Sequence, residues 1–224
     1  MDDPRALLRE HLREAADWLA ARQGENVKAP VPATEDLAVV RAEYAERLFE
    51  AFIGYVSSTG AVTSWRNAAR RAVVEAFPAA FYTGYVDGGG EDTEYEDEAW
   101  LTARLNQELE FIAGVFETLK EWRASEDFTE GDVQARVDGY VATLEGVYTE
   151  GKLRGSRNKT LEFDGDDGEE SCPDCQRLKG KRHTIKWILA NNAIPRPGND
   201  YFECQGYKCQ HYWVDPNTGE RYTF

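Results

Sequence analysis

The first 171 residues of this 224-residue chain contain no cysteine, which excludes disulfide bonds within most of the protein. The chain also lacks any apolar run approaching the ~20 residues that a membrane-spanning helix requires. It begins Met1-Asp2-Asp3-Pro4, which is acidic where a secretory signal peptide would be basic. These absences predict a protein made and kept in a reducing cytosol, where thiols serve as metal ligands more often than they form disulfides.

The usual patterns of a catalytic site are missing as well. The sequence shows no nucleophile paired with a base, no phosphate-binding glycine loop and no paired carboxylates on a recognisable scaffold. A nuclease of the His-Asn-His type would need a further pair of histidines near the cysteines, and only His183 and His211 are available there. We therefore expect no catalysis and keep a metal-supported nuclease as an alternative.

Positive charge is scarce and unevenly distributed. The chain carries a net charge of -15, yet residues 172–213 hold seven basic and three acidic residues, a net of +4, so the remainder carries -19. Two acidic runs, 87–98 with seven carboxylates and 162–170 with six, are typical of a solvated surface and a flexible linker. A basic segment beside an acidic body could also orient the protein against another surface.

Apolar residues recur every three or four positions through most of the first 160 residues, as they do in amphipathic helices. The pattern predicts helices whose apolar stripes run from Leu8 to Leu19, Leu37 to Tyr55, Trp65 to Phe77, Leu101 to Leu119 and Val133 to Tyr148. Thr34 is the expected N-cap of the second helix, and Pro78 should kink or end the third. Thr129 and Asp132 resemble a capping box for the fifth. Helices of this length, joined by short polar breaks, predict an irregular antiparallel bundle.

The character of the chain changes after Gly155. Residues 158–163 read as a short strand, residues 184–191 as a short helix, and Asp215-Pro216-Asn217-Thr218-Gly219 as the turn of a β-hairpin. The expected fold class is therefore α+β and predominantly α. An N-terminal irregular helical bundle should be followed by a small cysteine-rich α/β module, stapled by a metal and ending in a hairpin.

All four cysteines lie in two close pairs, Cys172-Pro173-Asp174-Cys175 and Cys204-x4-Cys209. Thiols paired in this way on two facing turns suit a tetrahedral metal ion, most naturally Zn²⁺, which replaces a hydrophobic core that so short a segment cannot build. We take the four thiolates as ligands, with His211 as a substitute for one of them and His183 as a third choice. Two local disulfides, one disulfide with two free thiols, or a redox role for the first pair stay open.

The order of motifs around these cysteines resembles a known family. The first pair is followed by Leu178-Lys179-Gly180-Lys181-Arg182-His183, by Trp187, by a Pro-Gly segment and by Cys204-x4-Cys209-x-His211. This order resembles the C-terminal motif of the phage Mu F-like head morphogenesis proteins, also called minor head or minor capsid proteins. Residues 148–159 look like the segment that enters the module in that family. Here His211 stands where the family usually has its last cysteine.

The resemblance implies a helical domain over residues 1–156 and a Mu F-like zinc-binding module over residues 157–224. It also implies a role in phage or prophage head morphogenesis at or near the portal, with a structural zinc ion. The protein would be found in the virion, and in the host cytoplasm during assembly. Its expected partners are the portal and major capsid proteins, with DNA as a further contact of the basic module and no membrane. The first alternative is a non-catalytic zinc-ribbon adaptor that binds nucleic acid or host protein.

Overall fold

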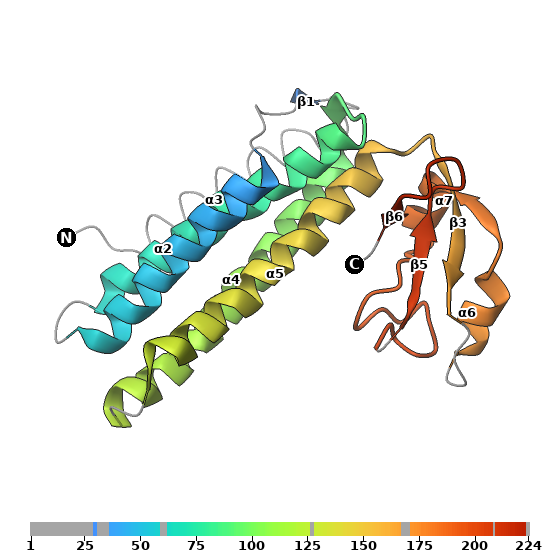
Figure 1. Cartoon of the computed structure of the whole chain (residues 1–224). Coiled ribbons are helices and arrows are strands. Elements are labelled where there is room, and N and C mark those ends of the chain that lie inside the picture. Colours follow the sequence, from blue (N-terminus) through green and yellow to red (C-terminus); the bar gives the residue numbers. More distant parts are fainter. Residues whose placement is uncertain are drawn as a thin grey trace. The chain divides into compact units, whose positions relative to one another are not determined.

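The computed structural model of the chain describes residues 29–30, 36–58, 62–125, 128–166, 171–207 and 209–222. Its long helices are α2 (Leu37–Ser57), α3 (Val62–Asp87), α4 (Tyr95–Ser125) and α5 (Glu130–Gly155) (Figure 1). The predicted α+β, predominantly α class is confirmed. The helix predicted from Leu8 to Leu19 lies outside the described residues. None of the helices within the described ranges combines the length and apolarity needed to cross a membrane.

The chain forms two compact units. The helical unit comprises Met1–Tyr82 and Asp92–Leu144, and the C-terminal unit comprises Thr83–Glu91 and Glu145–Phe224. The last turns of α3 and α5 therefore belong to the C-terminal unit, together with the short strands and helices that follow α5. The domain boundary predicted between residues 156 and 157 stays a prediction.

Aromatic side chains form the centre of the helical unit. Phe52 of α2 contacts Phe116 of α4 and Tyr140 of α5 edge to face, with ring centroids 5.7 and 6.4 Å apart. Tyr44 of α2 meets Phe77 of α3 at 6.1 Å. Such pairs add to the free energy of apolar burial. Apart from Tyr140, these rings come from positions that the sequence placed on apolar stripes, so the prediction that the stripes face a core is confirmed.

Two helix boundaries differ from the prediction, and one agrees. Helix α2 is capped by Asp36, whose Oδ1 accepts a 2.7 Å hydrogen bond from Ala38 N, and not by Thr34. Helix α3 does not end at Pro78 but continues to Asp87, because buried residues such as Phe81 and Tyr85 extend its apolar face. The capping box before α5 is confirmed, since Thr129 N donates to Asp132 Oδ2 and Asp132 N donates to Thr129 Oγ1.

Three carboxylates are buried inside the described part of the helical unit, Asp97, Glu98 and Glu108, and Glu108 has a clearly shifted pKa. Glu108 of α4 is 1% exposed, and Arg104 Nη2 lies 3.2 Å from its Oε2. Neither carboxylate oxygen makes a well-oriented hydrogen bond to another described residue. Burial therefore raises the pKa of Glu108 above its ordinary value, and the nearby Arg104 only partly opposes the rise.

The sign of this shift gives a testable pH dependence. The folded protein holds the Glu108 proton more tightly than the unfolded chain, so stability should fall as pH rises from the ordinary value of 4.5 through the raised pKa. At pH values above the raised pKa, the Glu108→Gln variant should be more stable than the parent by about 1–3 kcal/mol. At pH 4 this difference in stability should disappear. Urea unfolding at several pH values measures this difference, with Glu110→Gln, an exposed change on the same helix, as the control. A variant that loses stability at pH 8 would show that the Arg104 ion pair dominates.

The remaining strands and helices are short. They are β1 (Ala29–Pro30), β2 (Asp92–Thr93), β3 (Thr160–Gly165), α6 (Pro173–Leu178), β4 (Arg182–Thr184), α7 (Ile185–Ala190), β5 (His211–Val214) and β6 (Arg221–Tyr222). Strands β1 and β2 pair with each other, and the other four form an antiparallel sheet in the order β4-β3-β5-β6. The predicted hairpin (β5 with β6) and the helix at 184–191 (α7) are confirmed, and the strand predicted at 158–163 is shifted to 160–165.

The C-terminal unit has a hydrophobic core of its own, contrary to the expectation that so short a segment cannot build one. Leu161 and Phe163 of β3, Ile185 and Ile188 of α7, and Trp213 of β5 are fully buried in one cluster. The cluster also contains Cys172 and Cys175. A metal ion at the cysteines would therefore reinforce an existing core.

The ends of α3 and α5 pack with their backbones in close contact. A Cβ atom on Gly84 would lie 1.9 Å from the Tyr148 carbonyl oxygen, and one on Gly155 would lie 2.0 Å from that of Tyr85. Real Cβ atoms do not approach other atoms so closely, so glycine is required at both positions. Leu153 of α5 also belongs to the buried cluster that contains Cys172 and Cys175.

Candidate metal centre

The first pair of cysteines is positioned by helix α6. Cys172 is the N-cap residue, with extended backbone, and Pro173 occupies the first helical position, where its fixed φ and missing N–H fit the start of a helix. The Gln176 N–H bonds to the Cys172 carbonyl at 3.1 Å and closes the first turn. One helical turn thus separates Cys172 from Cys175 and allows both thiols to face the same region.

The second pair lies on the long loop between α7 and β5. Gln205 and Gly206 both have positive φ, and the turn is closed by a 3.1 Å bond from Tyr207 N to the Cys204 carbonyl. A Cβ on Gly206 would lie 2.0 Å from the Arg196 carbonyl oxygen. A glycine is therefore needed at this position both for its φ and for the close approach of the loop to itself.

Asn199 and Trp213 hold this loop in place. Asn199 is buried, and its amide group donates to the Asn192 carbonyl at 2.7 Å and to the Ile194 carbonyl. Trp213 donates from Nε1 to the Ala193 carbonyl at 2.6 Å. The loop that carries Cys204 and Cys209 is thus ordered by hydrogen bonds that involve no cysteine.

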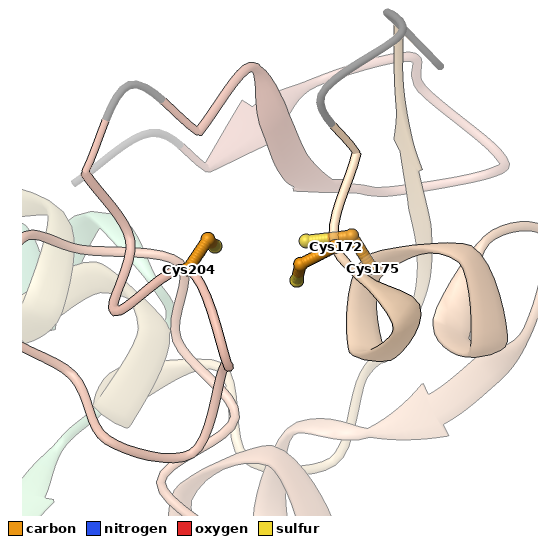
Figure 2. A group of neighbouring side chains, drawn as sticks. All are labelled: Cys172, Cys175 and Cys204. Carbon is orange, nitrogen blue, oxygen red and sulfur yellow. The ribbon is translucent and has the colours of Figure 1, made fainter.

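The two pairs come together. The thiol sulfurs of Cys172, Cys175 and Cys204 lie within 4.8 Å of one another, and Figure 2 shows Cys204 facing Cys172 and Cys175 from the opposite loop. Cys175 and Cys209 have sulfurs 3.7 Å apart. Two sulfurs bound at about 2.3 Å to one tetrahedral Zn²⁺ would lie about 3.8 Å apart, so the separation of Cys175 and Cys209 fits such an ion. All four cysteines are free thiols, and a disulfide would bring the sulfurs to about 2.05 Å.

His211 is a fifth donor at the same place. Its Nδ1 lies 3.7 Å from Cys209 Sγ, and Cys175, Cys209 and His211 form a second group of donors within 4.8 Å. The ring is 7% exposed and stacks on Phe163, with centroids 5.4 Å apart and planes 4° from parallel. His183, the third-choice ligand, stacks instead on Trp187 at 3.7 Å and belongs to neither group.

The contacts among the thiols shift the pKa values of Cys175 and Cys209 in opposite directions. The hydrogen bond from Cys175 lowers the pKa of Cys209 to about 5, and His211 acts in the same direction. The same bond, together with burial, raises the pKa of Cys175. Metal binding requires thiolates, so an ion at this site would have to displace the proton held by Cys175, and its affinity would increase with pH.

The antiparallel sheet bears on the redox alternative for the first cysteine pair. Redox pairs of the Cys-x-x-Cys type normally open a helix within a βαβ unit, and here the pair does open helix α6 after strand β3. However, β3 and the following strand β4 are antiparallel, so no βαβ unit is formed. Cys175 is also only 1% exposed, whereas reactive cysteines are partly exposed.

Helix α6 and strand β4 were not predicted from the sequence. A proline directly after Cys172 was a usable indication of a helix start. The described residues establish a cysteine-rich cluster of Cys172, Cys175, Cys204, Cys209 and His211 that could hold a metal ion. Comparison with protein-family models, with curated proteins and with solved structures found no match for this chain.

Proposed function

We propose that the cluster holds one structural Zn²⁺, bound by the thiolates of Cys172, Cys175, Cys204 and Cys209. The observation that carries this proposal is that two groups of donors from separate segments, Cys172-Cys175-Cys204 and Cys175-Cys209-His211, share Cys175, with the donor atoms of each group within 4.8 Å of one another. Four protein ligands leave no position open for water or substrate, so the ion would tie α6 to the loop and perform no chemistry. His211 would then lie beside Cys209 as a neighbour able to donate to its sulfur.

We further propose that the protein is a minor head protein of a phage or prophage, acting in head morphogenesis at or near the portal. The resemblance of residues 148–224 to the Mu F-like motif suggests this function. The thiol cluster supports it, because it brings together the residues on which the motif is built. The long helices supply extended faces for partner proteins such as the portal and the major capsid protein.

The charge distribution favours an anionic partner for the C-terminal unit. Residues 176–199 contain six basic residues and no acidic one. Three of the six are paired, Arg177 with Asp174, Arg182 with Glu162 and Arg196 with Glu150. The other three are lysines, whose charges would attract the phosphate groups of DNA or an acidic protein face. Such contacts would weaken as salt concentration rises.

The proposed function is tested by locating the protein. Phage particles induced from the source strain should contain this chain in a few copies per head, and it should co-purify with the portal protein. Elemental analysis of the purified protein should find close to one zinc per chain. A protein that is abundant in induced cells but absent from purified heads would contradict the assembly role. If the protein absent from heads still carried zinc, the zinc-ribbon adaptor alternative would replace the proposed assembly role.

A further inference from the structure

Asp174 links the two turns that carry the cysteines. Its Oδ2 accepts a 3.0 Å hydrogen bond from the backbone N–H of Glu203, and its Oδ1 accepts a 2.9 Å bond from Arg177 Nη2. Both carboxylate oxygens are therefore engaged, and the side chain is 26% exposed. The bond to Glu203 runs from helix α6 to the long loop across 29 residues of sequence.

The hydrogen bond between Asp174 and Glu203 joins the residues that directly precede two of the cysteines. Asp174 directly precedes Cys175, and Glu203 directly precedes Cys204. A hydrogen bond between these two neighbours fixes the backbone that carries one thiol relative to the backbone that carries another. The separation of the two halves of the cluster is then set partly by a contact that does not involve sulfur.

We propose that Asp174 is a positioning residue of the metal centre, which holds the two cysteine-bearing turns at the spacing that the ion requires. This inference rests on the proposed metal site. A carboxylate accepting a backbone N–H is among the stronger hydrogen bonds in proteins, because its acceptor is charged. Loss of residues that orient metal ligands typically lowers metal affinity by about 10–100-fold.

Electrostatics alone would predict the opposite effect. Four thiolates around Zn²⁺ leave a net charge of about -2, so a carboxylate next to the site repels it. If Asp174 acted only through its charge, neutralising it would strengthen metal binding. If it acts by positioning, the isosteric Asp174→Asn change should weaken binding, because a neutral amide oxygen is a weaker acceptor than a carboxylate oxygen and would have to serve both the Glu203 N–H and Arg177. The two explanations therefore differ in sign.

The experiment measures zinc affinity by competition with a chromogenic chelator at fixed pH and ionic strength. We expect Asp174→Asn to bind zinc about 10–100-fold more weakly than the parent chain. Glu203→Gln is the matched control, since it removes a neighbouring acid but keeps the backbone N–H that Asp174 accepts, and its affinity should be unchanged or slightly higher. Arg177→Ala releases the other carboxylate oxygen and should have little effect.

Cobalt substitution supplies a second readout. The visible absorption of Co²⁺ in the parent chain should show tetrahedral thiolate coordination, and Asp174→Asn should need more Co²⁺ to reach the same spectrum. Recovery of that spectrum at saturating metal would show that the variant still folds. Unchanged or tighter zinc binding by Asp174→Asn overturns the positioning role alone. Absence of zinc and cobalt binding by the parent chain would overturn the proposed metal site itself, and the role of Asp174 with it.

Discussion

The Cys172→Ser, Cys175→Ser double variant should lose the proposed metal ion and the ordered structure around the cysteines while keeping most of its helicity. Serine cannot replace a thiolate, so two of four ligands disappear and the remaining pair cannot hold zinc tightly. The lost metal contribution should be on the order of 5 kcal/mol, at the upper end of single-site effects. At about 4–8 °C per kcal/mol, melting of the C-terminal unit should fall by roughly 20–40 °C.

The two units allow this loss to be localised. Most of α2 to α5 lies in the helical unit, so far-UV circular dichroism should change little. Near-UV dichroism should change strongly, because Phe163, Phe202 and Trp213 pack in the same buried cluster as Cys172 and Cys175. Limited proteolysis should cut first in the loop between α7 and β5 and leave the helices.

Two controls separate metal loss from local damage. Treating the parent chain with a strong chelator should reproduce the variant's near-UV spectrum, and adding zinc should reverse it. Gln176→Ser, an exposed change on the same short helix, should retain metal and stability. Unaltered near-UV dichroism and protease resistance in the double serine variant would refute a structural metal at this site.

A second large effect is expected at the crossing of α3 and α5, where Gly84→Ala should strongly destabilise the C-terminal unit. The new methyl group would lie 1.9 Å from the Tyr148 carbonyl oxygen, a backbone atom that cannot move without shifting α5. Separating the helices would disturb the hydrogen bonds from Ser156 Oγ to the Gly88 carbonyl and from the Tyr148 hydroxyl to Asp87. We expect a loss of about 3–5 kcal/mol, as in severe overpacking.

The same unit provides a matched control for this substitution. Gly146 lies on α5, two residues from Tyr148, and a Cβ there would meet no atom within 4 Å. Gly146→Ala should therefore stabilise the protein by up to about 1 kcal/mol, through the higher helix propensity of alanine. Chemical denaturation of both variants measures the difference. Equal stability of the two would contradict the close backbone contact.

Local patterns in the sequence were enough to predict several features. The spacing of Val40, Tyr44 and Leu48 identified the buried face of α2, because helical periodicity brings such residues to one side whatever their partners are. The Thr129–Asp132 box and the turn at Asp215–Gly219 were also predictable, since their hydrogen bonds form between near neighbours. The grouping of four cysteines in two close pairs indicated a metal ligand set for the same reason.

Other features depend on residues far apart in the chain. The continuation of α3 past Pro78 depends on partners that bury Phe81 and Tyr85, and the burial of Glu108 depends on the helices packed around α4. The need for Gly84 arises only because α5 crosses at that point. These contacts join residues separated by tens of positions, and local propensity contains no information about them.

The candidate metal centre likewise has features that the sequence determines and features that depend on tertiary contacts. By itself, the sequence determined which residues have donor atoms and that the four cysteines fall in two close pairs. Only the tertiary structure decided that the second pair faces the first, that His211 joins it while His183 stacks on Trp187, and that Asp174 bonds across to Glu203. The physical reason is that metal ligands must lie within a few ångströms of one another although they come from separate segments. The packing of the sheet, α6 and the long loop between α7 and β5 sets those distances.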